Sequence, residues 1–251
     1  MGNLIKMDWY RLRSSTFFLV SLIVSFVLNL AFSIGMPLLN RFFAPDAAPD
    51  AVSFSYILAN PISFTILFVL MLMSLVSFSY ADLANGYIKN IAGQLPNKGL
   101  TVISKFVVGA IHNCIFFVVF LASTIIGNFI VNKVVFDDQI IAAVGTFFIK
   151  FLLSLGLTAI LLFVSTGLRS KTLASILGVL FGSGMLTLVY MGLNTLFQQS
   201  VDVNEYAPDS LFSQVNVSSG MLVFNAILVA VICIAVFLPL TVTVFNKRDI
   251  K

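Results

Sequence analysis

The feature that most constrains this chain is a series of long apolar runs separated by short polar gaps. Each run has about the 20 residues that a helix needs to cross the hydrocarbon core of a bilayer. Charged residues make up 10% of the 251 residues, whereas soluble domains carry about 25%. A transmembrane β-barrel would instead need alternating segments of about ten residues. The sequence therefore predicts an all-α integral membrane protein, with a single transmembrane domain over residues 1–251.

The apolar runs predict six membrane-spanning helices. We expect Pro37 to close the first of them and Asn60-Pro61 to open the second. The expected spans cover residues 16–36, 60–80, 102–125, 147–168, 172–197 and 221–245.

Residues 1–15 predict a short interfacial helix before the first span. Leu4, Ile5, Trp9 and Leu12 can share one face of this helix. The basic residues of the segment are expected to lie away from that face; they are Lys6, Arg11 and Arg13. An apolar face that carries tryptophan, opposed by a basic face, is typical of a helix lying at a membrane surface.

The basic residues are distributed unequally between the two sides of the predicted topology. Eleven fall on the side that holds both termini, Arg41 and Lys133 fall on the other, and Lys150 lies near the outer end of the fourth span. The positive-inside rule therefore predicts that both termini are cytoplasmic. Seven acids fall on the outer side, where they would attract a cationic amphipathic peptide. They are Asp46, Asp50, Asp137, Asp138, Asp202, Glu205 and Asp209.

The sequence offers little that could carry catalysis. His112 is the only histidine, and we expect it to form a buried hydrogen-bonded pair with Asn113 rather than to bind a metal. No segment matches the GxxxxGK[ST] nucleotide-binding motif. No acid lies deep in a predicted span, which argues against an ion-coupled carrier. Cys114 and Cys233 are expected to be buried small hydrophobic residues. We therefore predict a non-enzymatic chain with no catalytic residue, metal or cofactor of its own.

Two patterns of small or polar residues lie inside the predicted spans. Ser21, Ser25, Asn29 and Ser33 recur every four residues in the first span and form a polar stripe. Such a stripe either packs against another helix or lines a transport pathway. In the fifth span, Gly178 and Gly182 form a small-xxx-small pair, which is found at helix contacts and at dimer faces.

The longest polar connection on the basic side covers residues 79–100. Leu83, Tyr87 and Ile91 lie four residues apart in it, with Ile88 beside them. This spacing predicts a short amphipathic helix over about residues 82–92, held at the membrane surface.

These features together resemble the permease subunit of bacterial ABC exporters of the type-2 membrane family, in particular the small permeases of lantibiotic immunity and peptide export. The most specific part of the resemblance is an acid followed by Gly-x-Ile-Lys-Asn, with a proline and a lysine downstream. In this chain these residues are Asp82, Gly86, Ile88-Lys89-Asn90, Pro96 and Lys105. Further likeness lies in segment 168–172 and in the ending 245–250.

The resemblance implies that the helix over 82–92 is a coupling helix, which seats in a groove of a separate ABC ATPase subunit. The residues that would contact the ATPase or transmit its motion are Asp82, Leu83, Asn85, Gly86, Tyr87, Ile88 and Lys89. It also implies two ATPase copies that hold ATP and Mg²⁺, a second permease subunit that is identical or related, and no nucleic acid. Spans 1 and 5 would face that second permease. The implied location is the bacterial cytoplasmic membrane.

The sequence leaves two alternatives to the export of antimicrobial or amphipathic peptides. The chain could be a membrane-embedded immunity protein that binds a peptide without transporting it. It could instead export drugs or lipids. An intramembrane enzyme has no support, because no side chains that could carry a reaction are grouped in the sequence.

Overall fold

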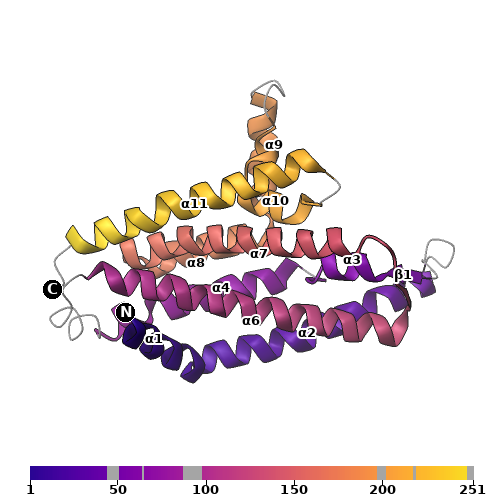
Figure 1. Cartoon of the computed structure of the whole chain (residues 1–251), viewed down its shortest axis with the longest axis horizontal. Coiled ribbons are helices and arrows are strands. Elements are labelled where there is room, and N and C mark those ends of the chain that lie inside the picture. Colours follow the sequence, from indigo (N-terminus) through magenta and orange to yellow (C-terminus); the bar gives the residue numbers. More distant parts are fainter. Residues whose placement is uncertain (44–50, 64, 87–97, 197–201, 217–218, 248–251) are drawn as a thin grey trace.

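The computed structural model describes residues 1–43, 51–63, 65–86, 98–196, 202–216 and 219–247. These residues form an elongated bundle of helices, with one helix projecting from its side (Figure 1). The bundle is nearly all-α and holds five helices long and apolar enough to cross a membrane, or six if one bent pair counts as a span. The predicted fold class of a multi-pass helical membrane protein is therefore confirmed.

The first half of the chain supplies α1, α2, α4 and α6. Helix α1 covers Gly2–Ser14 and α2 covers Thr16–Phe43. Helix α4 covers Thr65–Ala84 and α6 covers Gly99–Val131. The short helix α3, Phe54–Ala59, lies between α2 and α4. The helix predicted over residues 1–15 is therefore present as α1. Helix α2 packs along α6.

The second half of the chain supplies α7 to α11. Helix α7, Ile140–Leu162, continues into the π-helical turn η2, Phe163–Gly167. Helices α8, Lys171–Ser183, and α9, Leu186–Leu196, follow. The short segments η3, Val203–Glu205, and α10, Pro208–Gln214, precede α11, Gly220–Lys247. Helix α8 packs on α4, and α11 packs on α7.

The two ends of the bundle are distinct. The N-terminus and the end of α11 lie at one end, which we call the α1 end (Figure 1). The other end carries strands β1, Ala51–Ser53, and β2, Lys133–Val135, and we call it the strand end. The strands pair in parallel, with Ala51 opposite Lys133. Helices α2 and α6, which precede the two strands in the sequence, run in the same direction (Figure 1).

Several boundaries differ from those predicted. Helix α2 continues through Pro37 to Phe43. Proline is tolerated within membrane-spanning helices more often than within soluble ones. Helix α4 begins at Thr65 rather than at Asn60-Pro61. The carbonyl of Pro61 lies outside this helix and accepts hydrogen bonds from Asn29 and Thr124.

The predicted fifth span, residues 172–197, is not one straight helix. It is divided into α8 and α9, whose axes differ by 77°. Gly184 lies at the break with a φ of 71°, a left-handed conformation that ends a helix and that glycine adopts without strain. Helix α9 therefore points away from the side of the bundle (Figure 1).

Candidate functional site

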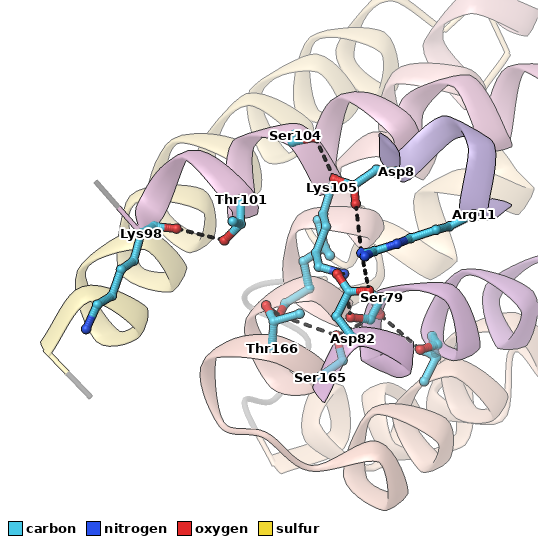
Figure 2. A network of polar contacts seen from close by, with 12 residues as sticks. Asp8, Arg11, Ser79, Asp82, Lys98, Thr101, Ser104, Lys105, Ser165 and Thr166 are labelled. Carbon is cyan, nitrogen blue, oxygen red and sulfur yellow. Dashed lines mark hydrogen bonds and ion pairs between the residues drawn. The ribbon is translucent and has the colours of Figure 1, made fainter. Parts of the chain in front are cut away.

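A group of charged side chains lies at the α1 end of the bundle, where α1, α4 and α6 meet. We call Asp8, Arg11, Asp82, Ser104 and Lys105 the ion-pair cluster (Figure 2). Asp82 lies in the last turn of α4, and Lys105 lies in the second turn of α6. These two helices flank residues 85–98, so the cluster lies at the base of the long polar connection.

Asp82 is the centre of the cluster. Its Oδ1 atom lies 2.6 Å from Nη1 of Arg11, and its Oδ2 atom lies 2.8 Å from Nζ of Lys105. The side chains of Asp82 and Lys105 are only 9% and 3% exposed. Such short, charge-assisted contacts are among the stronger hydrogen bonds in proteins. One carboxylate thus binds α4 to both α1 and α6.

Asp8 adds a second carboxylate to the cluster. It is buried, accepts a 2.5 Å hydrogen bond from the hydroxyl of Ser104, and lies 3.7 Å from Nη1 of Arg11. Burial raises the pKa of the Asp8 carboxyl above its ordinary value, although the charge of Lys105 opposes this change. The ionised form of Asp8 is therefore less favourable in the folded chain than in water.

Asp8→Asn is expected to change the free energy of unfolding by less than about 1 kcal/mol at neutral pH. The amide keeps an oxygen that can accept from Ser104, and it removes a charge whose burial is unfavourable. Because the pKa is raised, the folded state binds the proton more tightly than the unfolded state. Any stability gain of the variant should therefore be present above the folded-state pKa and should vanish as the pH falls. Thermal unfolding of wild type and variant at pH 8 and pH 5 measures this difference, and a large loss at both would contradict it.

The cluster continues into the π-helical turn η2. Lys105 also donates to the backbone carbonyl of Ser79 at 3.2 Å, and its Nζ lies 5.4 Å from the centre of the Phe78 ring. The hydroxyl of Ser79 lies 2.8 Å from that of Ser165 in η2 (Figure 2). The turn after η2 contains Arg169 with a φ of 58°, and Ser170 then caps α8. A set of polar contacts therefore leads from α1 through α4 and α6 to η2, the turn that precedes α8.

The position of the Arg11 side chain differs from the predicted one. We expected it on the solvent side of the first helix, but its guanidinium turns toward the bundle and pairs with Asp82. The buried face of α1 consists of Leu4, Asp8 and Leu12. The sequence does place two ionisable residues, Asp82 and Lys105, just inside apolar runs, which indicates that each needs a partner but not that Arg11 is one.

The predicted coupling residues divide into four groups. Asp82 is buried and acts as an anchor within the chain, so it is a positioning residue rather than a surface for a partner. Leu83 packs beside Val102 and Phe245. Asn85 is exposed and Gly86 partly so, and they form a turn with a φ of 65° at Gly86. Tyr87, Ile88 and Lys89 lie outside the described residues. The start of the predicted 82–92 helix is therefore the last turn of α4, which ends at Ala84.

The polar stripe of the first span faces the interior of the chain. Ser21, Ser25, Asn29 and Ser33 are all buried, and with Phe18 they are the only buried residues of α2. Asn29 donates to the hydroxyls of Ser123 and Thr124 in α6, each at 2.8 Å. The structure thus accounts for the stripe by helix packing, and it places none of the four side chains on an outer face.

Gly178 and Gly182 also lie at a contact within the chain. A Cβ atom added at Gly182 would lie 2.7 Å from Cα of Val69 in α4, whereas one added at Gly178 would meet nothing closer than 3.8 Å. Gly182 therefore permits the close approach of α8 to α4. The pair does not form an outward face in the described part of the chain.

A buried polar network occupies the middle of the bundle, as predicted for His112 and Asn113. Nδ1 of His112 lies 3.1 Å from Oδ1 of Asn113, and Nε2 lies 3.1 Å from the hydroxyl of Ser74. Asn113 also donates to Thr158 at 2.9 Å. Of the two cysteines, Cys233 is buried as expected, but Cys114 is exposed on the outer face of α6.

No protein-family model matches this chain, and a search of curated proteins finds no match to it.

Proposed function

We propose that the chain is the permease subunit of an ATP-driven ABC exporter, with its α1 end in the cytoplasm. The observation that carries this proposal is the ion-pair cluster. It binds together both helices that flank residues 85–98 and also the amphipathic helix α1. A connection held in this way can pass a force from a cytoplasmic protein to the whole bundle.

The mechanism follows from the contacts of Asp82. ATP would close two ATPase subunits, and their motion would press on residues 85–98. Because Asp82 is bonded to Arg11 and Lys105, α1, α4 and α6 would move together as a rigid body. A second permease, identical or related, would move in the opposite sense and open a path between the two. ATP and Mg²⁺ belong to the ATPase in this scheme.

The proposed substrate is an antimicrobial or amphipathic peptide, on the strength of the resemblance. The acidic outer loops add little to this assignment, because two of their carboxylates already have partners. Asp137 accepts from the hydroxyl of Ser55, and Asp209 is buried and accepts from Tyr190. Among the described acids, Asp138 is exposed and Glu205 is partly exposed. Asp202 is also exposed, but its Oδ1 atom already accepts from Asn194 and Asn204.

The test co-expresses an ABC ATPase from a neighbouring gene with the tagged wild-type permease or with its Asn85→Trp variant, and the lack of any such gene would count against the proposal. Asn85 is exposed at the turn after α4, so the bulky side chain should block a partner groove without disturbing the bundle. We expect the amount of co-purified ATPase to fall about tenfold, equivalent to about 1.4 kcal/mol of binding. Gln139→Trp is the matched control, because Gln139 is an exposed amide at the strand end of the bundle, directly before α7.

Equal recovery of the ATPase with Asn85→Trp and with Gln139→Trp would contradict the coupling assignment. Failure of the wild-type chain to retain any ATPase would overturn the exporter proposal. In that case, binding of a peptide by the isolated chain would favour an immunity protein that acts without transport.

A further inference from the structure

A second feature of the structure lies away from the ion-pair cluster, beside the break between α8 and α9. A cavity of about 240 Å³ is bounded there by α7, α10, the start of α4 and the α8–α9 break. Its apolar wall includes Phe68, Phe181 and Phe212, of which Phe68 and Phe212 are stacked at 4.2 Å between ring centroids. Its polar lining includes Lys150 and Asp209.

Lys150 brings a positive charge to this cavity. The residue is 5% exposed, and its Nζ donates to the carbonyl of Ala59 at 2.9 Å and to Oδ1 of Asn60 at 3.0 Å. Both acceptors are neutral, and an ammonium group has three donors. Lys150 therefore retains a charge and a hydrogen-bond donor for an anionic group.

Asp209 brings a negative charge to the same cavity. The residue is 6% exposed, and its Oδ1 atom accepts a 2.8 Å hydrogen bond from Tyr190. Its Oδ2 atom is buried and has no hydrogen-bond partner among the described residues. Lys150 and Asp209 form no ion pair with each other. A buried charge is costly unless it is paired, so both residues fit a ligand that carries both signs.

The surroundings of the cavity indicate where such a ligand comes from. Gly182, Gly184 and Thr187 line the cavity at the α8–α9 break, and α9 continues from there with exposed apolar side chains. Leu188 is 71% exposed and Met191 is 57% exposed. An apolar helix surface beside a charged cavity matches a molecule with hydrocarbon chains and a polar head.

We propose that this cavity binds the headgroup of a lipid that carries a phosphate and a primary ammonium group. Lys150 contacts the phosphate, Oδ2 of Asp209 accepts from the ammonium, and the acyl chains lie along α9. Burial raises the pKa of the Asp209 carboxyl, and a bound ammonium favours its ionised form. This proposal does not rest on the exporter function, because it involves no ATPase and no residue of the ion-pair cluster.

The test is lipid binding to the purified full-length chain in detergent, followed by native mass spectrometry. The probes are phosphatidylethanolamine, phosphatidylcholine, which cannot donate to Asp209, and phosphatidylglycerol, which has no ammonium. We expect the apparent affinity for phosphatidylethanolamine to exceed both others about tenfold, as one charge-assisted hydrogen bond allows. Equal affinities for the three lipids would overturn the proposal.

Two variants test the charges of Asp209 and Lys150 one at a time. Asp209→Asn should remove the preference for phosphatidylethanolamine over phosphatidylglycerol, whereas Lys150→Met should weaken both about tenfold. Asp138→Asn and Lys133→Met are the matched controls, since both residues are exposed at the strand end. Unchanged selectivity in Asp209→Asn would overturn the assignment.

Should either variant fail to fold, the wild-type comparison of lipids still decides the proposal. A further arm uses soluble O-phosphoethanolamine, which has the same charged groups without acyl chains. Stabilisation of the chain against heating by the lipid but not by this compound supports a lipid ligand. Stabilisation by O-phosphoethanolamine alone would assign the cavity to a free zwitterion and overturn the lipid proposal.

Discussion

The Asp82→Asn chain is expected to lose about 3 kcal/mol of unfolding free energy in detergent. The amide cannot neutralise Arg11 and Lys105, and Lys105 is buried with its charge 2.8 Å from the lost carboxylate. Removing one member of a buried ion pair is more damaging than removing both, because the remaining charge is left unpaired. Denaturant or thermal unfolding followed by circular dichroism measures the loss.

The matched control for this variant is Asp138→Asn, which removes an exposed carboxylate at the strand end and should be neutral. The double variant Asp82→Asn with Lys105→Met should recover much of the lost stability. If Asp82→Asn is as stable as wild type, the cluster does not hold α1, α4 and α6 together. A stable Asp82→Asn chain would also remove the main support for the coupling mechanism.

Gly182→Ala is expected to destabilise the bundle by about 2 kcal/mol, because an added methyl group would overpack the contact between α8 and α4. The new Cβ atom would lie 2.7 Å from the Cα atom of Val69 and 2.8 Å from its backbone nitrogen. Backbone atoms cannot rotate away as a flexible side chain can, so one helix must shift. Thermal unfolding and the accessibility of an engineered cysteine on α8 would both report this shift.

The chain offers two internal controls for Gly182→Ala. Gly178→Ala meets only ordinary contacts at 3.8 Å or more, and Gly192→Ala meets nothing within 4 Å. Both should leave stability unchanged or raise it slightly, since alanine favours helices more than glycine does. A different pattern, in which Gly178→Ala and Gly182→Ala weaken self-association but leave unfolding unchanged, would assign the pair to a dimer face.

Hydropathy alone predicted the long helices of this fold because the apolar runs have the length of a bilayer. The amphipathic helix α1 was also predictable, since Leu4 and Leu12 lie on one helical face. The break at Gly184 was not, because a glycine inside an apolar run changes the backbone without changing the hydropathy. The short elements α3, β1, β2 and α10 carry too few residues for a clear periodic pattern.

The sequence predicted the location of the candidate site but not the contacts within it, because those contacts join residues far apart in the chain. The connection after α4 stands out in the sequence as a long polar segment, and Asp82 was named within it. The partners of Asp82 could not be derived, because Arg11 lies 71 residues away and reaches Asp82 only through the packing of α1 beneath α6. The proximity of Lys150 and Asp209 could not be derived from the sequence either. The two residues line one cavity because α10 packs against α7.

The bend between α8 and α9 also affects the surrounding membrane. Helix α8 has 13 residues and a length of about 20 Å, whereas α2 and α11 have 28 residues and a length of about 42 Å. The hydrocarbon core of a bilayer is about 30 Å thick. The hydrophobic thickness of the protein is therefore smaller on the α8 side than on the side of α2 and α11. On the α8 side the bilayer must thin or cover the apolar surface of α9. Such a one-sided mismatch makes the chain sensitive to membrane thickness at that side, and acyl-chain length becomes a variable that acts directly on the bend.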